Sequence, residues 1–199
     1  LAAAHFTNAN SGDLSTEDIN AVALLGKFGP ASVAAWYVDS MVADAYSVNV
    51  KAKVGPASVE FNHAAAELDA AGSKSETLTK LVASVKAGPA TIVAGYARTN
   101  DTTARNHGVD LTEDNDAKTN FRLDQIVLDD YNDADALLLG ASMTFGQTTV
   151  GASYLMATAD NFAGTTDLDA TELDLTVKYA MSKNFSITGL YADTDADLA

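Results

Sequence analysis

Five short turns, each flanked by stretches in which apolar and polar residues alternate, constrain the fold of this chain more than any other feature. The turns are Phe28-Gly29-Pro30-Ala31, Val54-Gly55-Pro56-Ala57, Ala87-Gly88-Pro89-Ala90, Phe145-Gly146-Gln147-Thr148 and Ala180-Met181-Ser182-Lys183-Asn184. Alternation indicates a strand with one apolar face, and a short connection between two such stretches predicts a β-hairpin. Proline suits these turns because it presets φ and cannot donate to a strand ladder. The chain is therefore predicted to be a succession of antiparallel hairpins.

The length and the aromatic residues of these strands point to a membrane wall. The predicted strands have about nine to eleven residues, the length of a tilted membrane strand, whereas soluble strands average about five or six. Aromatic residues recur near the ends of the apolar faces, as in the interfacial girdles of membrane barrels; they are Phe28, Tyr37, Tyr46, Phe61, Tyr96, Phe145, Tyr154, Tyr179, Phe185 and Tyr191. We predict an all-β fold, a transmembrane antiparallel up-and-down β-barrel with about ten strands visible here. The alternative is a soluble β-sandwich, whose strands also alternate. The many Ala and Gly residues on the apolar faces argue against it, because the buried faces of a sandwich rarely contain so many.

The composition excludes several classes of function. The 199 residues carry a net charge of −15 and no cysteine, so disulfides and thiolate metal sites are excluded. Nucleic-acid binding needs a basic surface, which this balance does not supply. An acidic balance favours cations, divalent metals or a solvating role.

Charge is distributed unequally between the two ends of the predicted strands. Lysines lie near the short turns, whereas most acids lie in the other connections, and only Glu60, Glu172 and Asp174 are predicted inside strands. In membrane barrels short turns face the periplasm and longer loops face outward. Acidic outer loops would concentrate cations at a pore mouth. Alternatively, they solvate the surface and bind the divalent ions that bridge lipopolysaccharide.

The polar faces of the strands supply the candidate pore-lining residues. A water-filled barrel directs one face of every strand into the lumen, so charged residues on that face would meet the solute. The candidates are Lys51, Lys53, Glu60, Lys80, Lys86, Glu172, Asp174 and Lys178.

The connection from residue 100 to 135 is the longest, and loops of this size are commonly functional or disordered. Folded inward, it would constrict the pore, and its charges would create a transverse field; the residues concerned are Arg105, Arg122, Asp124, Asp129 and Asp130. Folded outward, it would serve as a surface epitope or a trimer contact. Its acids also have an oxygen density suited to Ca²⁺, although not the spacing of an EF-hand; they are Asp110, Glu113, Asp114 and Asp116.

Catalysis is not predicted. The three histidines, His5, His63 and His107, stand in no nucleophile or metal motif, and the sequence contains no Gly-x-Ser-x-Gly, Walker loop or HExxH. A barrel enzyme would need His107 and the neighbouring loop acids to converge on one cleft. The chain is therefore predicted not to be an enzyme.

Two hairpins carry a family resemblance. The first hairpin joins Ala136–Gly146 to Thr149–Tyr154, and the second joins Glu172–Ala180 to Asn184–Ile187. Their sequences resemble those of Gram-negative outer-membrane porins, and most of all the major outer membrane porins of Campylobacter-like bacteria. The resemblance implies a barrel of sixteen to eighteen strands in the bacterial outer membrane, commonly a homotrimer, with a constriction loop and in some members bound Ca²⁺. It implies contact with outer-membrane lipid and lipopolysaccharide.

These observations lead to a prediction for the chain as a whole. Residues 1–199 are expected to form one segment of a barrel wall, incomplete at both ends, because both termini are predicted on the acidic-loop side. The predicted function is passive diffusion of ions and small hydrophilic solutes, with a preference for cations. The alternative is a structural or adhesive barrel with acidic surface loops.

Overall fold

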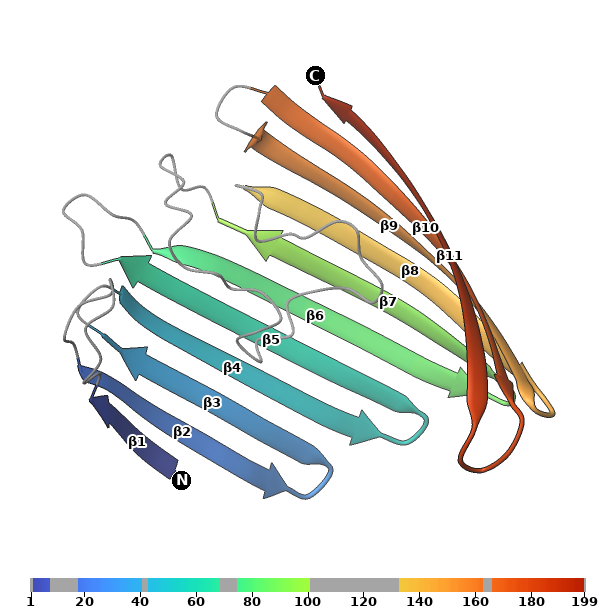
Figure 1. The fold of residues 1–199 in the computed structure, drawn as a ribbon, viewed down its shortest axis with the longest axis horizontal. Coiled ribbons are helices and arrows are strands. Elements are labelled where there is room, and N and C mark those ends of the chain that lie inside the picture. The colour runs from blue at the N-terminus through green and yellow to red at the C-terminus, as the bar shows by residue number, and fades with distance from the viewer. Residues whose placement is uncertain are drawn as a thin grey trace.

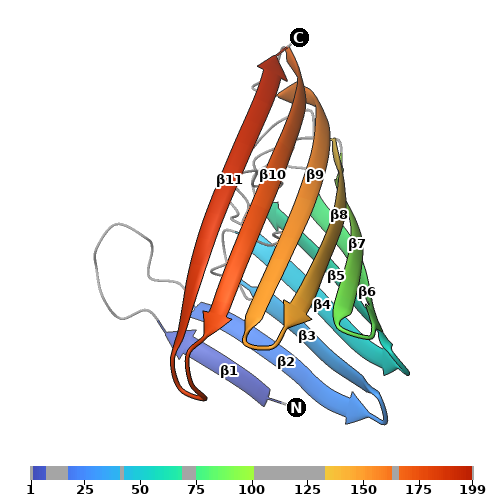
Figure 2. The ribbon, with the colours of Figure 1, turned by 90° about the vertical axis from the view of Figure 1, so that its right-hand side faces the viewer.

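The chain folds into one antiparallel sheet. The computed structural model describes residues 2–7, 18–40, 43–68, 75–100, 133–162 and 166–198. Eleven strands follow one another in chain order across the sheet. They are β1 (Ala2–Thr7), β2 (Asp18–Phe28), β3 (Ala31–Asp39), β4 (Ala43–Val54), β5 (Ala57–Leu68), β6 (Glu76–Ala87), β7 (Ala90–Thr99), β8 (Ala134–Phe145), β9 (Thr148–Phe162), β10 (Thr166–Ala180) and β11 (Ser186–Leu198). The sheet curves into a trough (Figures 1 and 2). The predicted all-β, up-and-down antiparallel fold is confirmed.

The sheet has one strand more than the ten that were predicted, and this strand, β1, changes the predicted position of the N-terminal end. β1 pairs with β2, and Ala2 lies opposite Ala23 in the middle of the wall. The prediction that the N-terminal end lies on the acidic-loop side was wrong, because β1 runs back along β2. β11 does run away from its short turn, as predicted, and its last residues pair with the loop end of β10.

Glycine at the first central position shapes four of the five short turns. Gly29, Gly55, Gly88 and Gly146 have φ values of 59°, 58°, 61° and 59°. A positive φ at the first central residue, followed by a residue with φ near −65°, describes a two-residue type II′ turn. This turn follows the right-handed twist of the strands, so each hairpin closes without splaying.

Each hairpin extends further than the one before it at the turn end of the sheet. The turn carbonyl groups of Pro30, Pro56 and Pro89 accept hydrogen bonds from the backbone N–H groups of Lys53, Lys86 and Thr144, at 3.1, 3.0 and 3.1 Å in that order. β4, β6 and β8 therefore continue beyond the end of the preceding hairpin. Such a stagger inclines the strands, as barrel closure requires.

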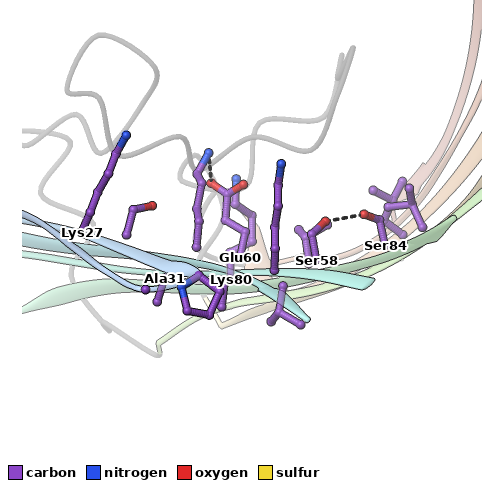
Figure 3. Close-up of a pocket in the computed structure, with 16 residues that line it drawn as sticks. Lys27, Ala31, Ser58, Glu60, Lys80 and Ser84 are labelled. Carbon is purple, nitrogen blue, oxygen red and sulfur yellow. Dashed lines mark hydrogen bonds and ion pairs between the residues drawn. The ribbon is translucent and has the colours of Figure 1, made fainter. Parts of the chain in front are cut away.

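The two faces of the sheet differ in chemistry. Alternate residues of a strand share a face, and one face is apolar and open: Leu139 is 49% and Val177 51% exposed. All ten predicted girdle aromatics are exposed, most of them on this outer face. The opposite, inner face carries most of the polar strand residues and lies on the concave side (Figure 3). An apolar outer face and a polar inner face are the arrangement of a membrane barrel.

The strands are longer at their loop ends than the sequence predicted. β9 and β10 each have 15 residues, and Asp39, Asp44 and Asp193 lie within strands rather than in loops. On the outer face each of these acids lies two residues from a tyrosine: Asp39 follows Tyr37, Asp193 follows Tyr191, and Asp44 precedes Tyr46. The placement of nearly all acids in connections was therefore wrong, because the ladders continue beyond the apolar band.

The inner face is not polar throughout. Near the loop ends of β5 to β10 it carries a buried cluster of small apolar residues, which are Ala64, Ala66, Leu78, Ala97, Ala134, Ala136, Leu138, Leu155, Ala157, Ala159 and Ala170. Sequence alternation did not reveal this cluster, because the outer face of the same strands is apolar as well.

Candidate functional site

The register places the predicted pore-lining residues on the same face of the sheet. Lys51 pairs with Glu60, and Asn62 with Lys80, across neighbouring strands. Glu172, Asp174 and Lys178 reach the same face through the ladders of β6 to β10.

A polar network centres on Glu60 in β5. Lys51 Nζ lies 3.0 Å from Glu60 Oε1, and Asn49 Nδ2 donates to the same oxygen at 3.0 Å. Asn49 also donates to Asn62. The carboxylate of Glu60 therefore neutralises Lys51 and orders the middle of β4 and β5, since charge-assisted hydrogen bonds are the stronger ones.

Around this network the inner face forms a concavity of about 860 Å³. Figure 3 shows Lys27 and Glu60 projecting from the same side of the sheet. Ser58 Oγ and Ser84 Oγ lie 2.7 Å apart at its edge. The full lining is Lys27, Gly29, Pro30, Ala31, Ser32, Lys51, Ala52, Lys53, Ser58, Val59, Glu60, Lys80, Val82, Ser84, Val93 and Leu138. Lysines, hydroxyls and one carboxylate suit contact with hydrated ions and polar solutes.

A pair of buried acids lies on β10. Glu172 is 1% and Asp174 4% exposed. Ser153 Oγ donates to Asp174 Oδ2 at 3.4 Å, whereas Asp174 Oδ1 has no hydrogen-bond partner among the described residues. The buried carboxylates of the inner face are thus on β10, where the exposed Lys178 lies on the same face nearer the turn.

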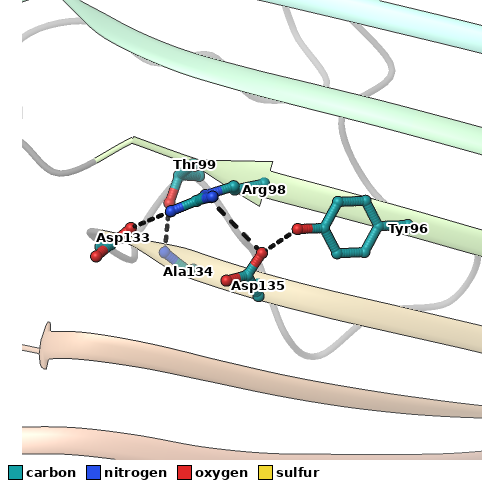
Figure 4. Close-up of polar contacts among 6 residues, drawn as sticks. All are labelled: Tyr96, Arg98, Thr99, Asp133, Ala134 and Asp135. Carbon is teal, nitrogen blue, oxygen red and sulfur yellow. Dashed lines mark hydrogen bonds and ion pairs between the residues drawn. The ribbon is translucent and has the colours of Figure 1, made fainter.

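A second polar network lies at the loop ends of β7 and β8 (Figure 4). Arg98 Nη2 lies 3.1 Å from Asp133 Oδ1, and Tyr96 donates to Asp135. Ala134 N–H donates to Thr99 Oγ1 at 2.8 Å. Sequence reasoning missed this network, although the charges on either side of the long connection were the available signal.

The partners of His63 are a hydroxyl group on each of the two neighbouring strands. Its Nδ1 is 2.8 Å from Thr79 Oγ1 and its Nε2 is 3.4 Å from the Tyr46 hydroxyl. All three residues share the outer face. The imidazole therefore belongs to a cross-strand polar cluster.

Two predicted sites lie outside the described residues and stay predictions. They are the constriction residues Arg105, Arg122, Asp124, Asp129 and Asp130, and the calcium ligands Asp110, Glu113, Asp114 and Asp116. In the part of the chain that the structure describes, no three His, Asp or Glu residues are grouped to hold a metal ion. A search of the same residues finds no helix able to cross a membrane.

Comparison with known protein families identifies the family of this chain. A family model described as Gram-negative porin matches residues 2–198. The chain belongs to the Gram-negative porin family. The porin is thus a β-barrel protein of the Gram-negative outer membrane, which confirms the predicted compartment. Its family also confirms that it is not an enzyme.

Solved outer-membrane structures share the fold of this porin. Acinetobacter baumannii OccAB4 has a TM-score of 0.69 and 14% identity, with 96% of the porin and 52% of that chain covered. Pseudomonas aeruginosa OccK10 (OpdN) has a TM-score of 0.68 and 14% identity, with 91% and 54% covered. The outer membrane protein opdK from Pseudomonas aeruginosa has a TM-score of 0.67 and 12% identity, with 92% and 53% covered. At these identities the likeness is one of fold alone.

The porin chain spans about half the length of the solved chains that it matches. The comparison with curated proteins gives no significant match.

Proposed function

We propose that this porin is a passive diffusion channel for ions and small hydrophilic solutes. The observation that carries the proposal is the contrast between the two faces of one sheet. The outer face exposes apolar and aromatic side chains, and the inner face carries charged residues around a concavity of about 860 Å³. Apolar residues facing lipid and polar residues facing a lumen are what a water-filled barrel needs.

The proposed channel prefers cations. The net charge of −15 supports this preference, as do the acids at the loop ends of the strands. A negative mouth raises the local concentration of cations, and the effect falls with ionic strength. The lysines of the inner face act in the opposite direction. The reversal potential in a KCl gradient measures the balance, and a potential that indicates anion preference at 0.1 M KCl contradicts this part of the proposal.

The proposed channel is a homotrimer that contacts lipopolysaccharide and binds Ca²⁺. We also propose that it is similar to the porins of Campylobacter-like bacteria. Cross-linking and light scattering in detergent test the trimer. Calcium titration of the purified porin tests the metal, with Asp114→Asn and Asp116→Asn as variants. An unchanged calcium affinity in both variants contradicts the assigned ligands.

Planar-bilayer conductance of the purified porin tests the channel itself. We expect stepwise, ohmic openings in KCl. Swelling of proteoliposomes in small sugars separates this channel from a plugged structural barrel, because a plugged barrel admits no sugar. A folded preparation that neither conducts nor admits sugar overturns the proposal.

A further inference from the structure

The lysines of the inner face are not scattered over it. Lys27, Lys53 and Lys86 are the penultimate residues of β2, β4 and β6, the strands that run down into short turns. Lys178 precedes the end of β10 by two residues, and Thr144 holds the matching place in β8. Four of five equivalent positions therefore carry a lysine that faces inward.

Each of these lysines faces a hydroxyl side chain across its own hairpin. Lys27 pairs with Ser32 and Lys53 with Ser58. Lys86 pairs with Thr91 and Lys178 with Thr188. The repeated pair of ammonium and hydroxyl groups supplies hydrogen-bond donors without a neutralising carboxylate.

The four lysines differ from the neighbouring Lys51, which Glu60 neutralises at 3.0 Å. Lys27, Lys53, Lys86 and Lys178 are all exposed. Among the described residues none of the four makes an ion pair. Their charges are therefore available to a solute.

The stagger of the hairpins brings Lys27, Lys53 and Lys86 to one level. Each hairpin extends beyond the preceding turn, and the lysine moves with it, so that it keeps its place next to the turn. Two strands at about 4.8 Å and two residues at about 3.3 Å separate the Cα atoms of Lys27 and Lys53, and those of Lys53 and Lys86, by roughly 12 Å. Lys178 lies four strands from Lys86, beyond the Thr144 position, and the same strand and residue spacings put its Cα atom roughly 20 Å away. A point midway between Lys27 and Lys53, or between Lys53 and Lys86, lies within the Debye length of about 10 Å at 0.1 M salt from both, so their fields overlap there.

We propose that Lys27, Lys53, Lys86 and Lys178 form a cationic collar at the turn end of the lumen, and that this collar binds multivalent oxyanions such as polyphosphates. The inference rests on the proposed channel function. An anion with several charged oxygens can contact two neighbouring ammonium groups and their paired hydroxyls, whereas a monovalent anion contacts only one. The acidic residues at the loop ends repel the same anion. We therefore expect the anion to enter from the turn side and to block the ion current from there.

Single-channel recording with inorganic tripolyphosphate tests the collar. Biotinylated Gln147→Cys, in the exposed β8–β9 turn, marks the turn side of each inserted porin when streptavidin is added. At 0.1 M KCl we expect tripolyphosphate to reduce the current when added on the turn side and to have a much weaker effect on the loop side. The block should fade in 1 M KCl, where the Debye length is about 3 Å.

Charge-removing variants locate the binding site. The triple variant Lys27→Gln, Lys53→Gln, Lys86→Gln should raise the half-blocking concentration about tenfold, because each lysine contributes a screened, exposed charge. The matched control is Lys183→Gln, which removes one exposed lysine in the β10–β11 turn rather than on the inner face. This control should leave the block nearly unchanged.

Three outcomes overturn the collar: equal block from both sides, no effect of the triple variant on the block, or an equal effect of Lys183→Gln. Conductance in KCl alone reports the channel itself. A porin that conducts without side-specific block therefore refutes the collar and leaves the proposed function standing. A porin that does not conduct refutes the proposed function.

Discussion

Arg98 and Asp133 join the two ends of the longest connection. Arg98 Nη2 lies 3.1 Å from Asp133 Oδ1, and Arg98 Nε lies 3.9 Å from Asp135 Oδ1. Asp133 has φ of 46°, and its N–H donates to Asn100 O at 3.1 Å. Asn100 in turn accepts from Thr77 N–H at 2.7 Å through its side chain. The end of β7 and the start of β8 are therefore held by side chains as well as by the ladder.

The left-handed backbone of Asp133 predicts a difference between two substitutions. Asp133→Ala and Asp133→Gly both remove the ion pair, but only alanine keeps a Cβ, which costs about 1 to 2 kcal/mol in the left-handed region. Asp133→Ala should therefore be the less stable variant by about 1 kcal/mol. Urea unfolding in lipid vesicles, followed by the fluorescence of the single tryptophan Trp36, measures the difference. Equal stabilities would mean that the turn relaxes.

The type II′ turns predict a cost for any side chain at their first position. Gly55 has φ of 58°, so Gly55→Ala should lower the free energy of unfolding by about 1 kcal/mol or more. Gly189→Ala is the matched control, because an added Cβ there would lie 3.9 Å from the nearest atom, Val177 O. Gly189 also lacks the positive φ. A loss of stability in Gly189→Ala as large as in Gly55→Ala would contradict this explanation.

The assignment of the two faces predicts opposite responses to a new charge on β8. Leu139 lies on the outer face with 49% of its surface exposed, and Ser142 lies on the inner face of the same strand. Leu139→Lys should destabilise the folded barrel by about 2 to 4 kcal/mol if it lies near the bilayer midplane. Ser142→Lys should be tolerated, because its ammonium group lies on the inner face, which lines the lumen of the proposed channel. Unfolding in lipid vesicles compares the free energies of unfolding of the two variants. If Ser142→Lys were the less stable variant, the inner face rather than the outer face would be the one that contacts lipid.

The ion pair on the inner face predicts a change in selectivity rather than in fold. Glu60→Gln removes the partner of Lys51, which lies 3.0 Å away. The inner face then gains one net positive charge, so the reversal potential of the proposed channel in a KCl gradient should shift toward anions. The double variant Lys51→Gln, Glu60→Gln removes both charges and should restore the original potential. An unchanged potential in Glu60→Gln would mean that this wall does not line the conducting path.

Local alternation was enough to predict which way most side chains point. Tyr46 and Lys51 were assigned to opposite faces from sequence, and the ladder of β4 and β5 places them so. This succeeds because successive residues of a strand point to opposite faces whatever the strand pairs with. The glycine and proline residues of the turns likewise act within two residues, so the hairpins were readable too.

Long-range pairing decided the features that alternation could not show. β1 was missed because a six-residue strand without a short turn has little pattern of its own. Asp39 and Asp193 lie in strands because hydrogen bonds to neighbouring strands continue past the apolar band.

The sequence by itself determined the hairpins, their turns and the face on which Lys53, Lys86 and Lys178 lie. Only the tertiary structure decided that Lys27, Lys53 and Lys86 share one level at the turn end. The direction of a side chain follows from the local pleat of its own strand. Its height in the wall depends on the register between strands, which is set by hydrogen bonds between residues distant in the chain.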